Sequence, residues 1–567
     1  MVSVGIDLGT TNSLVAVYEA EGPRIIKNAI GEMLTPSVVG LADDMKTVLI
    51  GRAAQQRLVR HPEQTKALFK RMMGTNTEVK LGRKRYTAVD LSAMVLSNLK
   101  ADAEADLGHT VTDAVISVPA YFNAVQRQAT KDAAEIAGLN VRRLINEPTA
   151  AALANGILDR DGESTFVVLD LGGGTFDVSI LEMFDGVMEV RASSGDAFLG
   201  GEDFTEALAR HFCEEKGLLW KNLRANEKEM LLSTAEQLKR ALERSEEATA
   251  QIELSGQTNS FTVTGDLFDQ VTAHLLTRLN RPIEKSLYDA DISPGDVDRV
   301  ILVGGATRMS CIRSLAAKVF KKLPERTIDP DHAIALGAAV QAGLADKHED
   351  LNDIVMTDVA PFSMGIESNH WEGKTVVAGA FAPIIERNTI LPASRRQFFS
   401  TAMDQQTKIE VRVFQGESAI AQDNVPLGML MVPVPPGPKG KEAIEVRFTY
   451  DVSGLLAVDV KVLSIGKTVS TVIDNLAEAM SDSEKAKRLK AMEALKVNAR
   501  DDAANIALIE GIKHLHEMLL GEDRQALMSI LARFETALET QDPSVIERER
   551  KEISDLIVQI EARFVQH

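Results

Sequence analysis

The chain has 567 residues, of which 45% are apolar and 26% charged, and its formal net charge is −19. A chain of this length exceeds one hydrophobic core, so several globular domains are expected. The acidic balance argues against a non-specific nucleic-acid binder and against a protein of anionic membrane surfaces.

Further absences narrow the class of protein. Only Cys213 and Cys311 occur, which excludes a disulfide framework and a cysteine-rich metal site. The N-terminus enters a strand-like run at Val2 without a basic and then apolar leader, and no apolar run is long enough to cross a bilayer. We therefore expect a cytoplasmic protein.

Residues 4–18 are the first informative stretch, because an apolar run leads into Asp7 and a turn before a second strand-like run. The turn needs Gly9 and exposes backbone N–H groups beside Thr10 and Thr11. A row of such amides forms a concavity that suits phosphate. One such turn alone is equally compatible with an ordinary hairpin.

Two charged residues in the next part of the chain have two interpretations each. Lys70 lies near the end of helix-like residues 67–74, where a lone lysine is ordinarily a solvated cation; beside a phosphate cleft it is a candidate to orient an attacking water. Glu147 opens an alanine-rich helix over 147–152, with proline near its first turn. It either favours that helix N-terminus or couples to the water shell of a cation.

Residues 166–180 repeat the order of the first hairpin: a β-branched run, Asp170, glycines, a threonine and another strand-like run. A flexible turn explains the glycines but not the match. The repetition predicts two related halves that face each other across a cleft and clasp a polyphosphate. Asp7, Asp170 and Asp177 would then surround one cation through its waters, which suits Mg²⁺ better than zinc.

Three later stretches complete this part of the chain. Residues 227–249 predict a long polar-periodic helix, whose simplest interpretation is a solvated one. Residues 300–308 end in glycines that let a base or ribose lie against the backbone, and Arg308 can stack on adenine. Residues 335–343 predict a small-residue helix made for close packing. Since neither a Walker A nor a Rossmann pattern occurs, a P-loop does not hold the nucleotide.

The sequence changes in texture after residues 1–352, which we expect to form a nucleotide-binding domain. Residues 353–358 place a short apolar segment between acids, which predicts a linker that docks or detaches. Short alternating runs over 359–475 predict a β-sandwich. Residues 476–567 predict a helical domain that begins at a capping signal near 481–484.

In order and spacing, these motifs strongly resemble the DnaK-type heat-shock chaperones. The matching motifs are Asp-Leu-Gly-Thr-Thr-Asn-Ser from residue 7, Val-Pro-Ala-Tyr-Phe from 118, Asn-Glu-Pro-Thr-Ala-Ala-Ala from 146, Asp-Leu-Gly-Gly-Gly-Thr-Phe-Asp from 170, Leu-Gly-Gly-Glu-Asp-Phe from 199 and Leu-Val-Gly-Gly-Ala-Thr-Arg from 302. The resemblance covers nearly the whole chain and is closest in appearance to the short HscC-like branch.

The resemblance implies a multidomain protein: an actin-like α/β ATPase of two ribonuclease-H-like lobes with ATP or ADP deep in the cleft, then a β-sandwich peptide-binding domain and an α-helical lid. It implies Mg²⁺ held through water, with K⁺ as an optional further ion. The implied catalytic residues are Lys70, Asp7, Glu147, Asp170, Thr175 and Asp177. The residues implied to hold the nucleotide are Gly9, Thr10, Thr11, Asn12, Gly172, Gly173, Gly174, Thr175, Gly200, Gly201, Glu202, Glu236, Lys239, Arg240, Gly304, Gly305, Arg308 and Asp331.

The resemblance also assigns residues to peptide binding and to coupling between the domains. The implied peptide-channel residues are Ile366, Phe399, Ala402, Ile409 and Val411. The implied coupling residues are Pro119, Arg143, Asn146, Ile354, Val355 and Met356. The implied partners are unfolded or client polypeptides and a J-domain co-chaperone that docks near Arg143 and Asn146, with a monomeric chain that binds neither nucleic acid nor membrane.

At several positions the sequence departs from the family pattern, which affects the partners and contacts that the resemblance implies. The stretch between residues 74 and 91 is shorter than usual, and 251–263 lacks the long loop typical of the family, which argues against a GrpE-type exchange factor. Glu243 stands where a serine usually contacts adenine, and Thr357 interrupts the apolar linker. An insertion at 369–381 alters the arch over the peptide channel.

Two other kinds of protein from the same superfamily are alternatives. A sugar or metabolite kinase would pass the phosphoryl group to a small hydroxyl and needs a general-base carboxylate and a sugar pocket. A filament-forming cytoskeletal ATPase needs no appended domain. Because both leave the linker and sandwich without purpose, we expect an ATP-dependent chaperone that binds extended hydrophobic segments, with slow ATP hydrolysis controlling peptide affinity.

Overall fold

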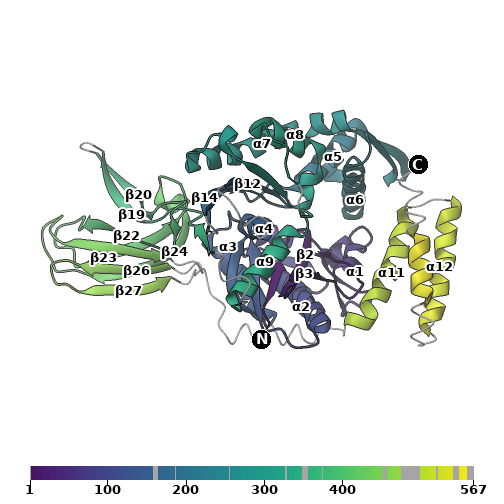
Figure 1. Cartoon of the computed structure of the whole chain (residues 1–567), viewed down its shortest axis with the longest axis horizontal. Coiled ribbons are helices and arrows are strands. Elements are labelled where there is room, and N and C mark those ends of the chain that lie inside the picture. The colour runs from purple at the N-terminus through teal and green to yellow at the C-terminus, as the bar shows by residue number, and fades with distance from the viewer. Residues whose placement is uncertain are drawn as a thin grey trace.

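Two mixed β-sheets organise the first 347 residues of the computed structural model (Figure 1). We call residues 2–156 the first lobe and residues 164–347 the second lobe. The structure describes residues 2–156, 164–184, 187–254, 256–325, 328–347, 355–372, 375–450, 456–473, 499–518, 521–539 and 548–557.

The sheet of the first lobe is built around the strand that ends at Asp7. Its order is β11-β10-β1-β2-β3, with β4 paired to β2; β1 runs parallel to β10 and antiparallel to β2. Every residue of β1 is buried, as expected for a central strand covered on both faces. The strands are β1 (Val4–Asp7), β2 (Asn12–Glu19), β3 (Gly22–Ile26), β4 (Thr35–Pro36), β10 (Asp113–Val118) and β11 (Asn140–Asn146).

The sheet of the second lobe has the order β17-β12-β13-β14-β18-β21. Its hairpin β12–β13 also has a parallel neighbour on one side, β17, and an antiparallel third strand on the other, β14. This matches the first sheet and confirms the prediction of two related halves at the level of strand order. The strands are β12 (Ser164–Leu171), β13 (Phe176–Phe184), β14 (Val187–Asp196), β17 (Arg299–Val303), β18 (Val355–Val359) and β21 (Ile390–Leu391).

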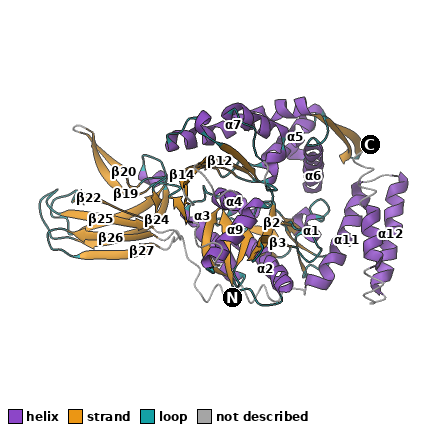
Figure 2. Cartoon of the chain, viewed as in Figure 1, coloured by secondary structure: helices purple, strands orange, loops and turns teal. Residues whose placement is uncertain are grey.

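Helices α4 (Glu147–Gly156) and α9 (Ala333–Ala345) lie between the two sheets (Figure 2). Their backbones approach so closely that a Cβ on Gly337 would lie 1.7 Å from the carbonyl oxygen of Ala150. Small side chains are therefore required at this crossing, and the prediction of close-packed alanine-rich helices is confirmed. The crossing joins the lobes where each glycine turn leaves its sheet.

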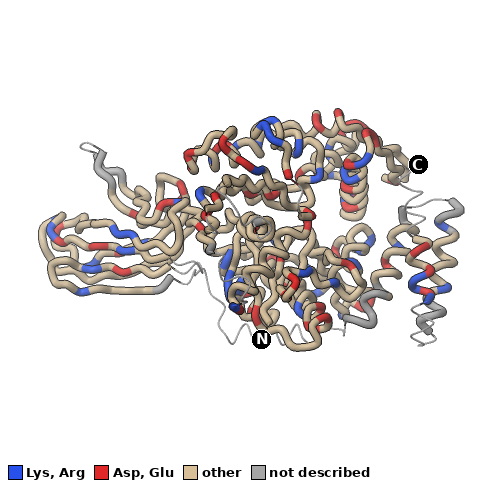
Figure 3. Tube along the Cα trace, in the orientation of Figure 1, with Lys and Arg blue, Asp and Glu red and all other residues tan. Residues whose placement is uncertain are grey.

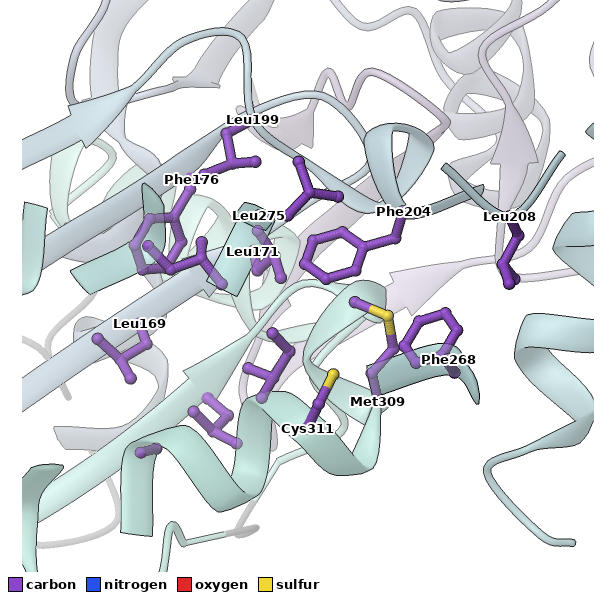
Figure 4. Close-up of a cluster of buried hydrophobic side chains, with 14 of the residues drawn as sticks. Leu169, Leu171, Phe176, Leu199, Phe204, Leu208, Phe268, Leu275, Met309 and Cys311 are labelled. Atoms are coloured by element: carbon purple, nitrogen blue, oxygen red, sulfur yellow. The ribbon is translucent and has the colours of Figure 1, made fainter. Parts of the chain in front are cut away.

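The hydrophobic core of the second lobe packs against the strands on both sides of the second glycine turn. Leu169, Leu171 and Phe176 flank the turn, and their side chains pack toward Phe204 and Phe268 (Figure 4). The rings of Phe204 and Phe268 stack with centroids 6.2 Å apart. Because these side chains are fully or nearly fully buried, the turn is anchored on both sides.

One predicted helix is too long. The polar segment 227–249 is helical only in α6 (Ala225–Ala241), and a hairpin of β15 (Glu247–Leu254) and β16 (Gln257–Thr264) follows. Buried and exposed residues alternate along the second half of β15, which is the period of a strand. Alanine and glutamate favour helix locally, but packing against the core of the second lobe overrides that preference.

Between residues 364 and 473, the described strands other than β21 form two four-stranded sheets around one apolar core. One sheet has the order β20-β19-β23-β24 and the other β22-β25-β26-β27. The strands are β19 (Met364–Glu372), β20 (Thr375–Ile385), β22 (Ala393–Ser400), β23 (Lys408–Gln415), β24 (Val425–Pro433), β25 (Ala443–Tyr450), β26 (Leu456–Val462) and β27 (Thr468–Ile473). The predicted sandwich is therefore present. Of the insertion predicted at 369–381, residues 373–374 lie outside the described residues.

The C-terminal helices α11 (Ala499–Met518) and α12 (Gly521–Glu539) lie beside the first lobe (Figure 1). Glu510 of α11 pairs with Arg57 and Arg60, and Ala507 packs into an apolar cluster with Ala53 and Ala54. The predicted helix start at 481–484 lies outside the described residues.

The remaining helices cover the outer faces of the sheets. Within the described part of the chain, none is both long and apolar enough to cross a membrane. Lys and Arg are interspersed with Asp and Glu along the trace (Figure 3). The helices are α1 (Arg52–Gln55), α2 (Ala88–Leu107), α3 (Ala124–Ile136), α5 (Gly201–Glu215), α7 (Gly265–Ala290) and α8 (Ser310–Phe320). Residues 75–86 contain a small hairpin of β8 (Val79–Leu81) and β9 (Lys84–Tyr86).

Candidate functional site

The two glycine turns meet, although they lie far apart in the sequence. A Cβ on Gly173 would lie 1.8 Å from Thr11 Oγ1, and a Cβ on Gly174 would lie 2.7 Å from Thr10 Cγ2. Only glycine fits at such contacts. Within the first turn, a Cβ on Gly9 would lie 2.0 Å from the carbonyl oxygen of Asn12, three residues further on. The structure thus brings together the two predicted phosphate loops.

Hydrogen bonds fix each turn. The Ser37 hydroxyl donates to the Gly9 carbonyl (2.7 Å), and the Ser37 N–H donates to the Thr11 carbonyl (2.8 Å). In the second turn the Gly172 N–H donates to the Thr175 carbonyl (3.1 Å). Ser37 follows Pro36 in an unremarkable stretch, and the sequence gives no signal for its role.

The start of α5 closes the second turn. The Gly201 and Glu202 N–H groups donate to the carbonyls of Gly172 and Gly173, each at 2.9 Å. A Cβ on Gly200 would lie 2.4 Å from the Gly173 carbonyl carbon. The turn is therefore held directly against the N-terminus of α5, whose dipole favours negative charge nearby.

A buried ion pair lies next to these turns. Lys70 Nζ donates to Glu147 Oε1 at 2.7 Å, and the two residues are only 3% and 5% exposed. Lys70 lies in the 3₁₀ turn η2 (Phe69–Met72), and Glu147 is the first residue of α4. The lysine ammonium also lies 5.6 Å from the centre of the Phe122 ring. Lys70 is thus a positioned, dehydrated cation rather than a solvated one.

Three buried aspartates gather around this pair. Asp7 ends β1, and Asp170 and Asp177 face each other across the β12–β13 hairpin. Burial and the nearby Glu147 charge raise the pKa of Asp7 to about 7 and that of Asp177 to about 8, and they raise the pKa of Asp170 well above its ordinary value.

The free oxygens of these aspartates test whether a cation fits. One oxygen of Asp7 accepts from the Ser117 hydroxyl (2.9 Å), and one of Asp177 accepts from the Tyr121 N–H (3.1 Å). Oδ2 of Asp170 and Oδ2 of Asp177 are buried with no hydrogen-bond partner among the described residues. Buried unpaired carboxylate oxygens fit the water shell of a divalent cation. No group of three or more His, Cys, Asp or Glu that could hold an ion is found in the described ranges.

The residues predicted to line the adenosine side split into two charged groups. Lys239 Nζ donates to the Gly201 carbonyl (2.8 Å) and pairs with Glu236, which also pairs with Arg240 (2.7 Å). Burial acts to raise the pKa of Glu236, but the charges of Lys239 and Arg240 outweigh it and lower that pKa to about 2. These side chains hold one another beside the start of α5.

The second charged group follows β17. Gly304 has φ +82°, and a Cβ there would lie 2.4 Å from the Leu171 carbonyl oxygen. A Cβ on Gly305 would lie 2.6 Å from Asp331 Oδ1. Arg308 pairs with Asp331 (2.8 Å) and with Asp329 (2.6 Å), so its guanidinium is held in place by two carboxylates. Asp329 was not among the predicted residues.

Among the predicted coupling residues, Asn146 contacts the linker strand β18 and Arg143 contacts α9. Asn146 Nδ2 donates to both oxygens of Asp358 (2.9 and 2.8 Å), while Arg127 Nη2 donates to Asn146 Oδ1 (2.6 Å). Arg143 Nη1 donates to Gln341 (3.2 Å), and Pro119 is buried just after β10.

The predicted linker extends the second sheet. Val355 and Met356 pair in parallel with Val187 and Met188 of β14, so the segment is docked. Ile354, the other predicted coupling residue of the linker, lies outside the described residues.

The predicted peptide-channel residues lie in the sandwich, away from the glycine turns. Ile366 and Val411 are buried in its core at 3% and 1% exposure. Phe399 and Ile409 are partly buried against that core, and Ala402 is exposed after β22. Three of the five side chains are therefore at least partly exposed, and the other two are core residues of the sandwich.

The comparison with known families follows this geometry. The family model described as Hsp70 protein matches residues 3–81 and 75–566, nearly the whole chain.

Proposed function

The chain belongs to the Hsp70 family, and from that premise we propose that it is an ATP-driven chaperone whose sandwich binds extended apolar segments of unfolded proteins. Hsp70 proteins as a family are ATPases and chaperones. One observation carries the proposal for this chain: Asn146 bonds to Asp358 of the linker strand β18, and the next residue, Glu147, bonds to Lys70 in the site. Asn146 and Glu147 are adjacent in the chain, so they connect the linker strand to the proposed catalytic lysine.

The reaction assigned to the site is attack of water on the γ-phosphorus of ATP, which breaks the bond to the bridging oxygen and yields ADP and phosphate. Lys70, held by Glu147, orients the water and faces the developing negative charge. Asp7, Asp170 and Asp177 hold the waters of Mg²⁺, which neutralises phosphate charge when bound. The turn at 172–174 supplies backbone N–H groups to the phosphates, and the start of α5 holds that turn in place.

Coupling to peptide follows from the docked sandwich. Besides the linker strand, Arg387 of the sandwich pairs with Asp289 of α7 (2.8 Å), and the Ala124 N–H donates to Gln415 (2.8 Å). We assign this docked arrangement to the ATP-bound state, and an undocked one to the state that holds peptide tightly. Each ligand then lowers the affinity for the other by the same coupling free energy.

Asn146→Ala is expected to uncouple the domains. It removes both hydrogen bonds to the buried Asp358 carboxylate, so the docked arrangement loses a charge-assisted contact. We expect stimulation of steady-state ATP hydrolysis by unfolded peptide to fall at least about fivefold, a coupling loss of about 1 kcal/mol. The measurement is the ratio of ATPase rates with and without a saturating unfolded peptide.

Asn140→Ala is the matched control. Asn140 lies in the same strand and donates to an aspartate, Asp113 (2.7 Å), but within the first lobe. It should keep the wild-type ratio. Equal ratios for Asn146→Ala and wild type would contradict the coupling role.

A kinase function is tested by the products. A coupled assay that finds a phosphorylated small-molecule acceptor in place of free phosphate would favour the kinase. Free phosphate, released faster with unfolded peptide, supports the chaperone.

The finer assignments belong to the same proposal: domain limits at 352, 358 and 475, a J-domain partner that docks near Arg143, no GrpE-type exchange factor, and membership of the HscC-like branch.

A further inference from the structure

Arg71 directly follows the proposed catalytic lysine, yet its side chain reaches the other lobe. Its Nη2 and Nη1 donate to Oδ2 and Oδ1 of Asp203 at 2.5 and 3.4 Å, across 132 residues of sequence. The two side chains keep only 22% and 20% of their surface exposed. The proposed function uses neither residue, and the sequence pattern did not single them out.

Asp203 connects this ion pair to the residues that hold the second glycine turn. It is the third residue of α5, and its Oδ2 also accepts from the Gly200 N–H (2.7 Å). Gly200 presses on the carbonyl of Gly173 in the second glycine turn. Arg71 is therefore tied, through one carboxylate, to the helix start that holds that turn.

The third nitrogen of the guanidinium faces the meeting point of the turns. Arg71 Nε is buried and has no hydrogen-bond partner among the described residues. A Cβ on Gly174 would lie 3.0 Å from this Nε and 2.7 Å from Thr10 Cγ2. A buried donor without a partner is unfavourable. The chemistry that satisfies a cationic N–H between two glycine turns is a phosphate oxygen.

We infer that Arg71 latches the two lobes over the terminal phosphate of a bound nucleotide and contacts that phosphate itself. Its terminal nitrogens hold Asp203, and its Nε donates to the phosphate. Because the two turns touch, a nucleotide held between them leaves only when the lobes separate, and that movement breaks the Arg71–Asp203 pair. The inference rests on the proposed nucleotide site.

The latch predicts an effect on release rather than on chemistry. Lys70, not Arg71, contacts Glu147, so loss of Arg71 leaves the water-orienting group in place. The direct test is stopped-flow release of a fluorescent ADP, methylanthraniloyl-ADP with Mg²⁺, from the full chain on mixing with excess unlabelled ATP.

Arg71→Ala is expected to speed release about tenfold, the size of one charge-assisted contact. Asp203→Asn should speed it by a similar factor, and the double variant should be no faster than either alone, since one interaction is lost. Arg71→Lys, which can still pair with Asp203 but lacks Nε, should fall between.

Arg85→Ala is the matched control, because Arg85 makes an exposed ion pair with Glu78 within the first lobe (3.5 Å). Wild-type release rates in both Arg71→Ala and Asp203→Asn would overturn the latch. Lost single-turnover hydrolysis without faster release would place Arg71 in the hydrolysis step alone and overturn the latch. Wild-type protein that binds no fluorescent ADP would overturn the proposed nucleotide site itself, so the two failures are distinguishable.

Discussion

Lys70→Ala is expected to slow hydrolysis of bound ATP at least about a hundredfold, because it removes a preorganised charge aimed at the developing negative charge of the transition state. ATP affinity should change much less, since the phosphate contacts assigned to the glycine turns stay intact. The measurement is single-turnover hydrolysis of preloaded ATP, with the ATP dissociation constant determined separately by titration.

The environment of Lys70 explains the size of this effect. The ammonium is 3% exposed and donates to Glu147, so little water screens its charge. Lys84→Ala is the control, since Lys84 is an exposed residue of β9 in the same lobe. A single-turnover rate for Lys70→Ala within about threefold of wild type would contradict the catalytic assignment.

Asp7→Asn is expected to raise the Mg²⁺ concentration needed for half-maximal ATP hydrolysis about 10- to 100-fold, the usual cost of losing an outer-shell partner of a metal. Asparagine keeps an acceptor for the Ser117 hydroxyl but removes the negative charge. The measurement is ATPase rate against Mg²⁺ concentration. Superimposable curves for variant and wild type would contradict the role of Asp7.

A stability measurement shows whether Asp7→Asn simply damages the fold. The raised pKa means that folded Asp7 holds a proton between pH 3.8 and about 7, where the unfolded group has lost it. Stability of the metal-free protein therefore falls as pH rises through that window, and the buried charge is fully unfavourable at pH 8. In EDTA, Asp7→Asn should raise the Tm by a few degrees at pH 8 and by less at pH 5. A lower Tm at both pH values would mean a misfolded variant.

Local sequence was sufficient for the parts of the site that the chain builds locally. Each hairpin has an apolar run, an aspartate, glycines and a second run within about fifteen residues, and both hairpins form where expected. Likewise, the small residues Ala150 and Gly337 predict that the two helices cross at a short distance. In these cases the backbone geometry requires particular residue types, so the sequence itself indicates the geometry.

Contacts between residues far apart in the sequence could not be predicted from local patterns. Arg71 and Asp203 are 132 residues apart, and Asn146 and Asp358 are 212 apart, so neither contact follows from any local pattern. Ser37 supports the first turn from outside it, through one hydroxyl and one N–H. The excess length of the helix predicted over 227–249 has the same origin, because a core elsewhere in the lobe selects the strand.

The central claim is that nucleotide in the lobes controls peptide affinity in the sandwich. The most direct measurement is the release rate of a fluorescent, leucine-rich unfolded peptide from the full chain, first with Mg²⁺ and ADP and then on mixing with ATP. We predict release with ATP to be at least about tenfold faster, a coupling of about 1.4 kcal/mol or more. Equal rates with the two nucleotides would contradict the account.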